Sequence, residues 1–232
     1  MIVVGDVHGN WRDLTEKVYA SGVHGAHIIQ VGDFGLGFNT PQREHELLAP
    51  LHRALVAAES VLHIIRGNHD DPAYWRPGHG HDWHYDTIRL VPDYTVLSVQ
   101  GARILCIGGA LSIDRILRRR NHGYWPDEGV VLDEGRLASL NLTDLWGVIT
   151  HTAPDIAPPF AIDPSVRGYL DVDPPLADDL RRERVALTQL YKVVRTRTPI
   201  PIWVYGHFHG QAESLHEGTR FILADVMQWL DL

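Results

Sequence analysis

Five apolar runs in this chain each end at residues whose side chains can bind metal ions. The runs are short and rich in β-branched residues, and glycines stand next to most of their ends, a pattern typical of buried strands that stop in tight turns. In chain order, the ends are Asp6-Val7-His8, Gly32-Asp33, Gly67-Asn68-His69-Asp70, His151 and Gly206-His207-Phe208-His209. One such polar turn would be ordinary. Five of them predict a fold that gathers the ends at a single site.

The first 65 residues alternate between strand and helix. Residues 2–4, 27–31 and 61–65 are apolar runs, whereas residues 11–20 and 41–58 carry apolar side chains at helical spacing. This alternation implies parallel strands joined by right-handed crossovers. In open α/β sheets, ligands bind at the carboxyl ends of the strands, which is where the first three polar ends lie.

The rest of the chain extends the α/β pattern, and we expect one domain over residues 1–232. The expected strands are 87–100 as two short runs, 103–107, 145–150, 202–205 and a hairpin of 211–215 with 220–224, and the expected helices are a short basic one at 112–120 and an amphipathic one at 176–195. No internal repeat or low-complexity linker divides this pattern.

Composition restricts the possible partners. The formal net charge of −8 argues against broad non-specific nucleic-acid binding, although it allows a small phosphorylated ligand. The single cysteine, Cys106, excludes a disulfide within the chain, so we expect a reducing, cytoplasmic setting. The first residues lack the features of a signal peptide, and no apolar run is long enough to span a membrane.

The strand ends supply oxygen and nitrogen ligands but no thiolate. The candidate metal ligands are Asp6, His8, Asp33, Asn68, His151, His207 and His209. Such donors suit Mn²⁺, which we favour, and also Fe, Zn²⁺ or Ni²⁺. Seven ligands exceed the needs of one tetrahedral ion and suit two ions about 3.5–4 Å apart that share a carboxylate. Two such ions can lower the pKa of a bridging water and polarise a phosphoryl oxygen, which leaves His69 as a proton donor.

The five motifs, in this order, resemble the calcineurin-like metallophosphoesterase family over residues 6–209. The resemblance implies a four-layer α/β/β/α sandwich with a dinuclear metal site. By the family pattern, one ion would be held by Asp6, His8, Asp33 and His209, and the other by Asp33, Asn68, His151 and His207. His69 would be the general acid for the leaving-group oxygen or would stabilise the transition state.

The sequence departs from the protein Ser/Thr phosphatases of that family. These enzymes continue the second motif with an Asp-Arg pair, where this chain has Leu36 and Gly37. The carboxylate that orients His69 and one phosphate-binding arginine are therefore missing from their usual places. Asp70 is a candidate replacement for the carboxylate and is grouped with His69 as catalytic. The candidate phosphate-binding cations are Arg66, Arg115 and Arg118.

We therefore expect an enzyme that hydrolyses phosphate mono- or diesters of small molecules or nucleotides through a metal-activated water or hydroxide. The alternatives are a Ser/Thr protein phosphatase, a dinucleoside polyphosphate hydrolase and a catalytically silent interaction module. The filled ligand positions argue against the silent module. Two local features stay open. The loop with His79, His81 and His84 is either an exposed polar loop or a third metal site, and Trp125 is either a core residue or stacks on a base.

Overall fold

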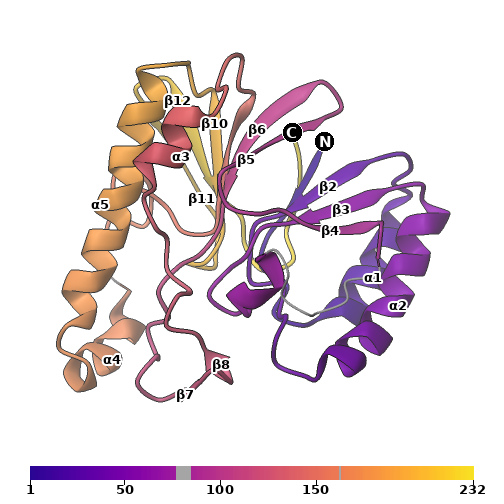
Figure 1. Cartoon of the computed structure of the whole chain (residues 1–232), viewed down its shortest axis with the longest axis horizontal. Coiled ribbons are helices and arrows are strands. Elements are labelled where there is room, and N and C mark those ends of the chain that lie inside the picture. The colour runs from indigo at the N-terminus through magenta and orange to yellow at the C-terminus, as the bar shows by residue number, and fades with distance from the viewer. Residues whose placement is uncertain (77–84, 162) are drawn as a thin grey trace.

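Two β-sheets lie face to face between two layers of helices in the computed structural model, which describes residues 1–76, 85–161 and 163–232 (Figure 1). This arrangement confirms the expected α/β/β/α sandwich. Helices α1 (Trp11–Ser21) and α2 (Pro41–Ala57) cover the outer face of one sheet. The outer face of the other sheet is covered by α3 (Glu134–Ser139) and the long α5 (Leu176–Arg195).

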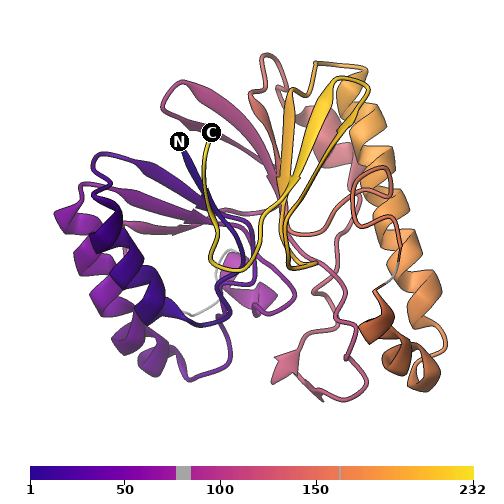
Figure 2. The ribbon, with the colours of Figure 1, turned by 180° about the vertical axis from the view of Figure 1, so that it is seen from behind.

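The first sheet has the strand order β13-β1-β2-β3-β4. Its strands are β1 (Ile2–Val4), β2 (His27–Gln30), β3 (Val61–Ile64), β4 (Ile88–Leu90) and β13 (Trp229–Asp231). The first four strands pair in parallel, which confirms the crossovers expected for the N-terminal part. The sequence analysis missed β13, which pairs antiparallel with β1 and brings the two termini side by side (Figure 2).

The second sheet has the strand order β11-β12-β10-β9-β6-β5. Its strands are β5 (Thr95–Val99), β6 (Ala102–Ile107), β9 (Gly147–Thr150), β10 (Ile202–Tyr205), β11 (Ala212–His216) and β12 (Thr219–Leu223). The four central strands are parallel, and the outer strands β5 and β11 are antiparallel to their neighbours. The expected C-terminal hairpin is therefore confirmed.

Apolar side chains fill all three interfaces between the layers. Because successive side chains of a strand point to opposite faces, Val3 and Ile29 face the other sheet while Val4 and Ile28 lie under the helices. Cys106 is fully buried in the layer between the sheets, where it packs as a small apolar residue. The stacked layers hold the carboxyl ends of the parallel strands in both sheets at fixed positions.

The prediction of a helix at residues 112–120 is wrong. This segment forms turns that lead into a small two-stranded sheet, β7 (Arg119–Arg120) with β8 (Gly123–Tyr124). Two of its arginines bind partners far away in the chain, since Arg115 pairs with Asp173 and the side chain of Arg118 contacts His69. These long-range contacts override a weak local preference for helix.

Three short helical segments complete the described structure: η1 (Pro72–Trp75), η2 (Pro164–Val166) and α4 (Arg167–Val172). The last two follow each other in the chain just before α5. Among the described residues, no helix combines the length and the apolar character that crossing a membrane requires.

Candidate metal centre

The polar strand ends of both sheets converge on one site. Asp6 and Asp33 follow β1 and β2 of the first sheet, whereas His209 follows β10 of the second. His8 and His209, 201 positions apart in the chain, bring their Nε2 atoms within 3.0 Å of each other. Because parallel strands place their carboxyl ends at a common edge, the two facing sheets deliver the ligands from opposite sides.

A first group of ligand atoms belongs to Asp6, His8 and His209, and these atoms all lie within 4.8 Å of one another. The Nε2 atom of His209 is 3.4 Å from Oδ2 of Asp6. Nδ1 of His8 is 3.8 Å from Oδ2 of Asp33, so one oxygen of Asp33 faces this group. The group contains three of the four residues that the family resemblance assigns to one ion, and Asp33 is the fourth.

A second group surrounds Oδ1 of Asn68. That oxygen lies 3.0 Å from Nε2 of His151 and 2.9 Å from Nδ1 of His207, and the same His151 atom is 3.1 Å from Oδ1 of Asp33. Donors about 2.0–2.2 Å from an ion and at right angles to one another are about 3 Å apart, so this spacing fits one divalent ion. Oδ1 of Asp33 lies in this second group and Oδ2 lies on the side of His8, so the carboxylate stands between the two groups.

Four of the seven candidate ligands have left-handed backbone conformations. The φ angles are 51° for His8, 56° for Asp33, 68° for His207 and 50° for His209. Positive φ is uncommon for residues other than glycine and is concentrated at functional sites, where the surrounding fold holds it in place. Here the tight turns direct the side chains back over the ends of the strands.

Two glycines allow the loops to approach the ligand carboxylates closely. A Cβ atom added to Gly67 would lie 2.1 Å from Oδ1 of Asp33, and one added to Gly206 would lie 2.1 Å from Oδ1 of Asp6. Any side chain at either position would displace a ligand. The glycines that precede the third and fifth motifs are therefore part of the geometry of the site.

The electrostatics keep two of the ligands, Asp33 and His207, in forms that bind metal, whereas the carboxylates of Asp33 and Asp6 outweigh burial and raise the pKa of His151 to about 9. Burial by itself would raise the pKa of Asp33, but the adjacent His151 outweighs this effect and lowers it, so the carboxylate is ionised. Burial lowers the pKa of His207 to about 3, which keeps its imidazole neutral. Carboxylate and neutral imidazole are the states in which these side chains coordinate divalent ions.

His69 lies at the edge of the centre. Its backbone N–H donates to Oδ1 of Asp33 at 2.7 Å, and Nη2 of Arg118 donates to its Nε2 at 2.9 Å. Burial lowers the pKa of the His69 imidazole to about 4. The imidazole is therefore neutral here, and Nε2 is the acceptor of the Arg118 hydrogen bond.

The proposed role of Asp70 in orienting His69 needs correction. Both carboxylate oxygens of Asp70 accept backbone hydrogen bonds at distances between 2.7 and 3.1 Å, from the N–H groups of Phe34, Gly35, Leu36 and Gly67. The side chain is fully buried, and burial raises its pKa to about 6. Asp70 thus links the loops of the second and third motifs and stabilises the turns that carry the ligands Asp33 and Asn68.

Two of the three candidate phosphate-binding arginines point elsewhere. The guanidinium of Arg66 is buried and donates to Oδ2 of Asp93 at 2.8 Å and to the carbonyl oxygen of Glu128 at 2.6 Å. Arg115 forms ion pairs with Asp173 and Asp179 at 2.6 and 2.7 Å. Their charges are already neutralised within the fold, so neither fits the expected role.

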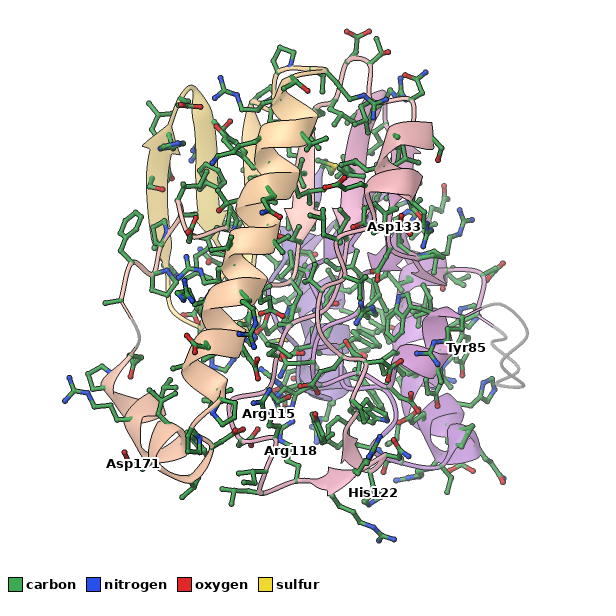
Figure 3. All side chains as sticks on the ribbon, turned by 60° about the vertical axis from the view of Figure 1, so that its left-hand side comes forward. Tyr85, Arg115, Arg118, His122, Asp133 and Asp171 are labelled. Atoms are coloured by element: carbon green, nitrogen blue, oxygen red, sulfur yellow. The ribbon has the colours of Figure 1, made fainter. Side chains whose placement is uncertain are left out.

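Arg118 lies beside the centre, as its contact with His69 shows. Oδ1 of Asp114, 2.7 Å from its Nε, sets the direction of the side chain. Figure 3 places Arg118 near the end of α5 from which α4 extends. Of the three arginines, Arg118 alone lines the cleft that opens onto the centre.

Sequence reasoning missed Ser112 and Glu128. Nδ2 of Asn68 donates to Oγ of Ser112 at 3.1 Å, and the backbone N–H of Ser112 donates to Oε1 of Glu128 at 2.6 Å. Burial raises the pKa of Glu128 to about 7. Ser112 lies just after the carboxyl end of β6. Because the ligands also follow strand ends, this position was the sequence signal that could have identified it.

The sequence left two questions open, the role of Trp125 and that of the histidine loop, and the structure answers only the first. Trp125 is 4% exposed and packs edge-on against Phe38 with ring centroids 5.4 Å apart, which supports the core interpretation. The loop residues His79, His81 and His84 lie outside the described ranges, so the choice between a polar loop and a third metal site stays open.

A cleft of about 940 Å³ opens onto the centre. Its inner end is lined by Asp33, Asn68, His69, Arg118, His207 and His209. Residues of η2, α4 and the first half of α5 line its outer end. This volume is in the range of pockets that bind small organic molecules.

Comparison with known proteins agrees with this geometry. The model of the calcineurin-like phosphoesterase family matches residues 1–211, whereas no curated protein matches the chain. Two solved structures are similar over 97% of this chain and 89% of their own. They are TT1561 of Thermus thermophilus, with 14% identity and a TM-score of 0.58, and the phosphopantetheinyl hydrolase PptH from Mycobacterium tuberculosis, with 15% identity and a TM-score of 0.52.

At these identities the two structures show likeness of fold, and the family match is the stronger finding. The family depends on a pair of metal ions, and the described residues of this chain include clusters of candidate metal ligands. The chain therefore belongs to the calcineurin-like phosphoesterase family and is a hydrolase that acts on phosphoester bonds.

Proposed function

We propose that this protein hydrolyses phosphate mono- or diesters of small molecules or nucleotides with the help of two divalent ions, Mn²⁺ in preference to Fe, Zn²⁺ or Ni²⁺. The observation that carries the proposal is the shared ligand Asp33, whose two oxygens face the two ligand groups at the inner end of one cleft. A reducing, cytoplasmic setting is part of the same proposal, supported by the one unpaired cysteine.

The proposed ligands of one ion are Asp6, His8, Asp33 and His209, and those of the other are Asp33, Asn68, His151 and His207. When bound, the ions supply Lewis acidity to a phosphoryl oxygen and lower the pKa of water. Arg118 binds the phosphoryl group, since its guanidinium is directed toward the inner cleft. His69 either gives a proton to the leaving-group oxygen or stabilises charge on the phosphoryl oxygens.

A small phosphorylated substrate is favoured over a phosphoprotein. Leu36 is fully buried and Gly37 has no side chain, so the second motif offers no substitute for the Asp-Arg pair of the protein phosphatases. PptH is described as a phosphopantetheinyl hydrolase, which adds modest support for a small organic ester. Efficient turnover of folded phosphoproteins, with poor turnover of every small ester, would contradict this preference.

Metal content and activity, measured on the same samples, test the proposal. With Mn²⁺, the wild type should bind two ions per chain by elemental analysis and hydrolyse p-nitrophenyl phosphate or its diester. Asp33→Asn should weaken both sites together and reduce kcat/KM by at least about 100-fold, because each ion contributes several kcal/mol to the transition state. His151→Ala should mainly empty one site.

Asp13→Asn is the matched control, since Asp13 is an exposed residue of α1. It should leave metal content and rate unchanged. Protein that binds two ions but hydrolyses no ester would support the non-catalytic interaction module instead.

A further inference from the structure

The cleft is larger than a phosphoryl group, and its outer part has a distinct chemical character. We propose that the substrate is a phosphate ester whose leaving group is bulky, partly apolar and free of negative charge, and that this group occupies the outer cleft. The inference rests on the proposed phosphoesterase function and narrows it to a class of substrate.

Apolar side chains form much of the outer wall. They are Ile113, Pro159, Phe160, Val166, Tyr169, Leu180 and Phe208. The Phe208 ring is centred 4.9 Å from that of the ligand His207, so apolar surface begins directly beside the metal centre. Phe160 is 72% exposed at the other end. An apolar leaving group would bury part of both rings, which stabilises binding by about 25 cal/mol for each Å² of apolar surface removed from water.

Carboxyl groups outnumber cations along the same wall. The acidic residues of the outer cleft are Asp155, Asp163, Asp178 and Glu183, and the basic ones are Arg181 and Arg184. Burial raises the pKa of Glu183 to about 7, so the three aspartates carry most of the negative charge. The outer cleft therefore has a small excess of negative charge, in contrast to the inner end, where metal ions and Arg118 would receive the phosphoryl group.

Both outer arginines already face acceptors of the protein. The guanidinium of Arg184 donates to four carbonyl oxygens, those of Ala153, Pro154, Ala157 and Pro159. The same group lies 5.2 Å from the centre of the Phe208 ring. Arg181 pairs with Asp178 at 3.4 Å. These contacts hold the wall together and occupy donors of both guanidinium groups within the protein.

A leaving group with its own phosphate or carboxylate would therefore meet aspartates and lose its hydration. Neutral hydroxyl, amide or aromatic groups would not meet this penalty, and an amine would be attracted. This reasoning disfavours dinucleoside polyphosphates, one of the alternatives for this site. It favours monophosphate esters of uncharged alcohols or phenols.

Three aryl esters test the inference in the presence of Mn²⁺. 4-Methylumbelliferyl phosphate is bulky and neutral beyond its phosphate, its 4-carboxymethyl analogue adds one carboxylate to the same ring, and p-nitrophenyl phosphate is a small reference. The added carboxylate is insulated from the phenol, so the two coumarin leaving groups depart with similar ease. We expect kcat/KM to be at least about tenfold higher for the neutral coumarin than for the anionic one.

Two lysine variants separate local charge from net charge. Asp178→Lys should narrow the preference for the neutral coumarin by about fivefold, because Asp178 lines the cleft. Asp171→Lys makes the same change in net charge on α4, outside the lining residues and on the side away from Arg115 (Figure 3). That control should leave the preference unchanged. Thermal unfolding verifies that both variants fold.

If Asp178→Lys fails to fold, Phe160→Ala takes its place. It should lower kcat/KM for 4-methylumbelliferyl phosphate about fivefold more than for p-nitrophenyl phosphate, because it removes apolar contact with the larger ring. Equal hydrolysis of the neutral and anionic coumarins, or equal effects of the two lysine variants, would overturn the inference while the phosphoesterase function stands. Failure to hydrolyse any of the three esters would overturn the inference, and failure to hydrolyse bis(p-nitrophenyl) phosphate as well would overturn the proposed function itself.

Discussion

An asparagine can present either its oxygen or its nitrogen to a metal site, and a neighbouring side chain decides which. In this protein, Nδ2 of Asn68 donates to Ser112, so Oδ1 faces His151 and His207. Ser112 is itself held by Glu128. Residues that hydrogen-bond to a metal ligand commonly set the orientation of that ligand and the affinity of the site for the metal.

Ser112→Ala should therefore weaken the second ion selectively. Without the hydroxyl, the Asn68 amide loses the partner that fixes its orientation, and we expect the affinity for one of the two Mn²⁺ ions to fall about 10–100-fold. Calorimetric titration with Mn²⁺ measures this change without reference to activity. Ser98→Ala, at an exposed position in β5, is the control. Two unchanged affinities would show that Ser112 does not position Asn68.

His69→Ala should reveal the role of His69 through the leaving group. A positioned general acid contributes about 10²–10⁴-fold, mainly when a poor leaving group needs a proton. If His69 is that acid, the variant should keep both ions, lose much activity on alkyl phosphates and lose less on p-nitrophenyl phosphate, provided that chemistry limits the rate. Equal losses on both esters would favour charge stabilisation, a role consistent with the Arg118 hydrogen bond at Nε2.

At the scale of elements, one arginine joins two parts of the cleft wall. Arg115 donates to Asp173, where α4 ends, and to Asp179 in the first turn of α5. Its side chain is 16% exposed. Figure 3 shows Arg115 and Arg118 in the same region near the end of α5. The two ion pairs of Arg115 thus anchor the turn that carries Arg118 to the helices that line the outer cleft.

Arg115→Ala should lower the free energy of unfolding by about 1–3 kcal/mol, because the partly buried carboxylate of Asp173 loses its partner and Asp179 keeps only Arg182. It should also raise KM for phosphate esters, because the Arg118 turn loses its anchor. Arg115→Lys should restore only part of both effects, since lysine lacks the forked donor geometry. Urea denaturation and steady-state kinetics measure the two effects.

The control for this prediction is Arg43→Ala. Arg43 forms an exposed pair with Glu46 on α2, and such pairs contribute about 1 kcal/mol at most. An unchanged KM in Arg115→Ala would mean that the Arg115 ion pairs stabilise the fold without positioning Arg118.

At the scale of the whole molecule, stability depends on three apolar interfaces and on buried polar groups in the sheets. One such group is the pair of His27 in β2 and His63 in β3, whose Nδ1 and Nε2 atoms lie 2.8 Å apart. His63 is 2% exposed, and burial lowers its pKa to about 4. Burial and Arg89 on β4 lower the pKa of His27 as well. The folded state therefore favours neutral imidazoles here.

The pH dependence of stability follows from these lowered values. Above about pH 6.5, His63 is neutral in both the folded and the unfolded protein. Below that pH the unfolded chain binds a proton at His63, whereas the folded chain binds it only near pH 4. The free energy of unfolding should therefore fall by up to about 3 kcal/mol as the pH falls from 6.5 to 4. His63→Gln should reduce this slope in denaturation measured across the range, whereas His24→Gln, at an exposed site, should not. Parallel slopes for the wild type and His63→Gln would contradict the assignment.

Much of the fold and of the candidate site could be predicted from the sequence because the relevant signals are local. Alternating apolar runs and helices predicted the parallel strands, and the residue types at the strand ends identified the candidate ligands, among them Asp33 and Asn68. Both the runs and their glycine-flanked ends are properties of a few neighbouring residues. The order of the motifs led to the family, which the match over residues 1–211 confirms.

The tertiary structure decided which partners each polar side chain has. Asp70 binds four backbone N–H groups and does not orient His69. Arg115 anchors two helices, whereas Arg118, three residues later, reaches the centre. Adjacent sequence positions do not reveal such differences, because the partners come from segments dozens of residues away and arrive only when the two sheets and their helices pack together.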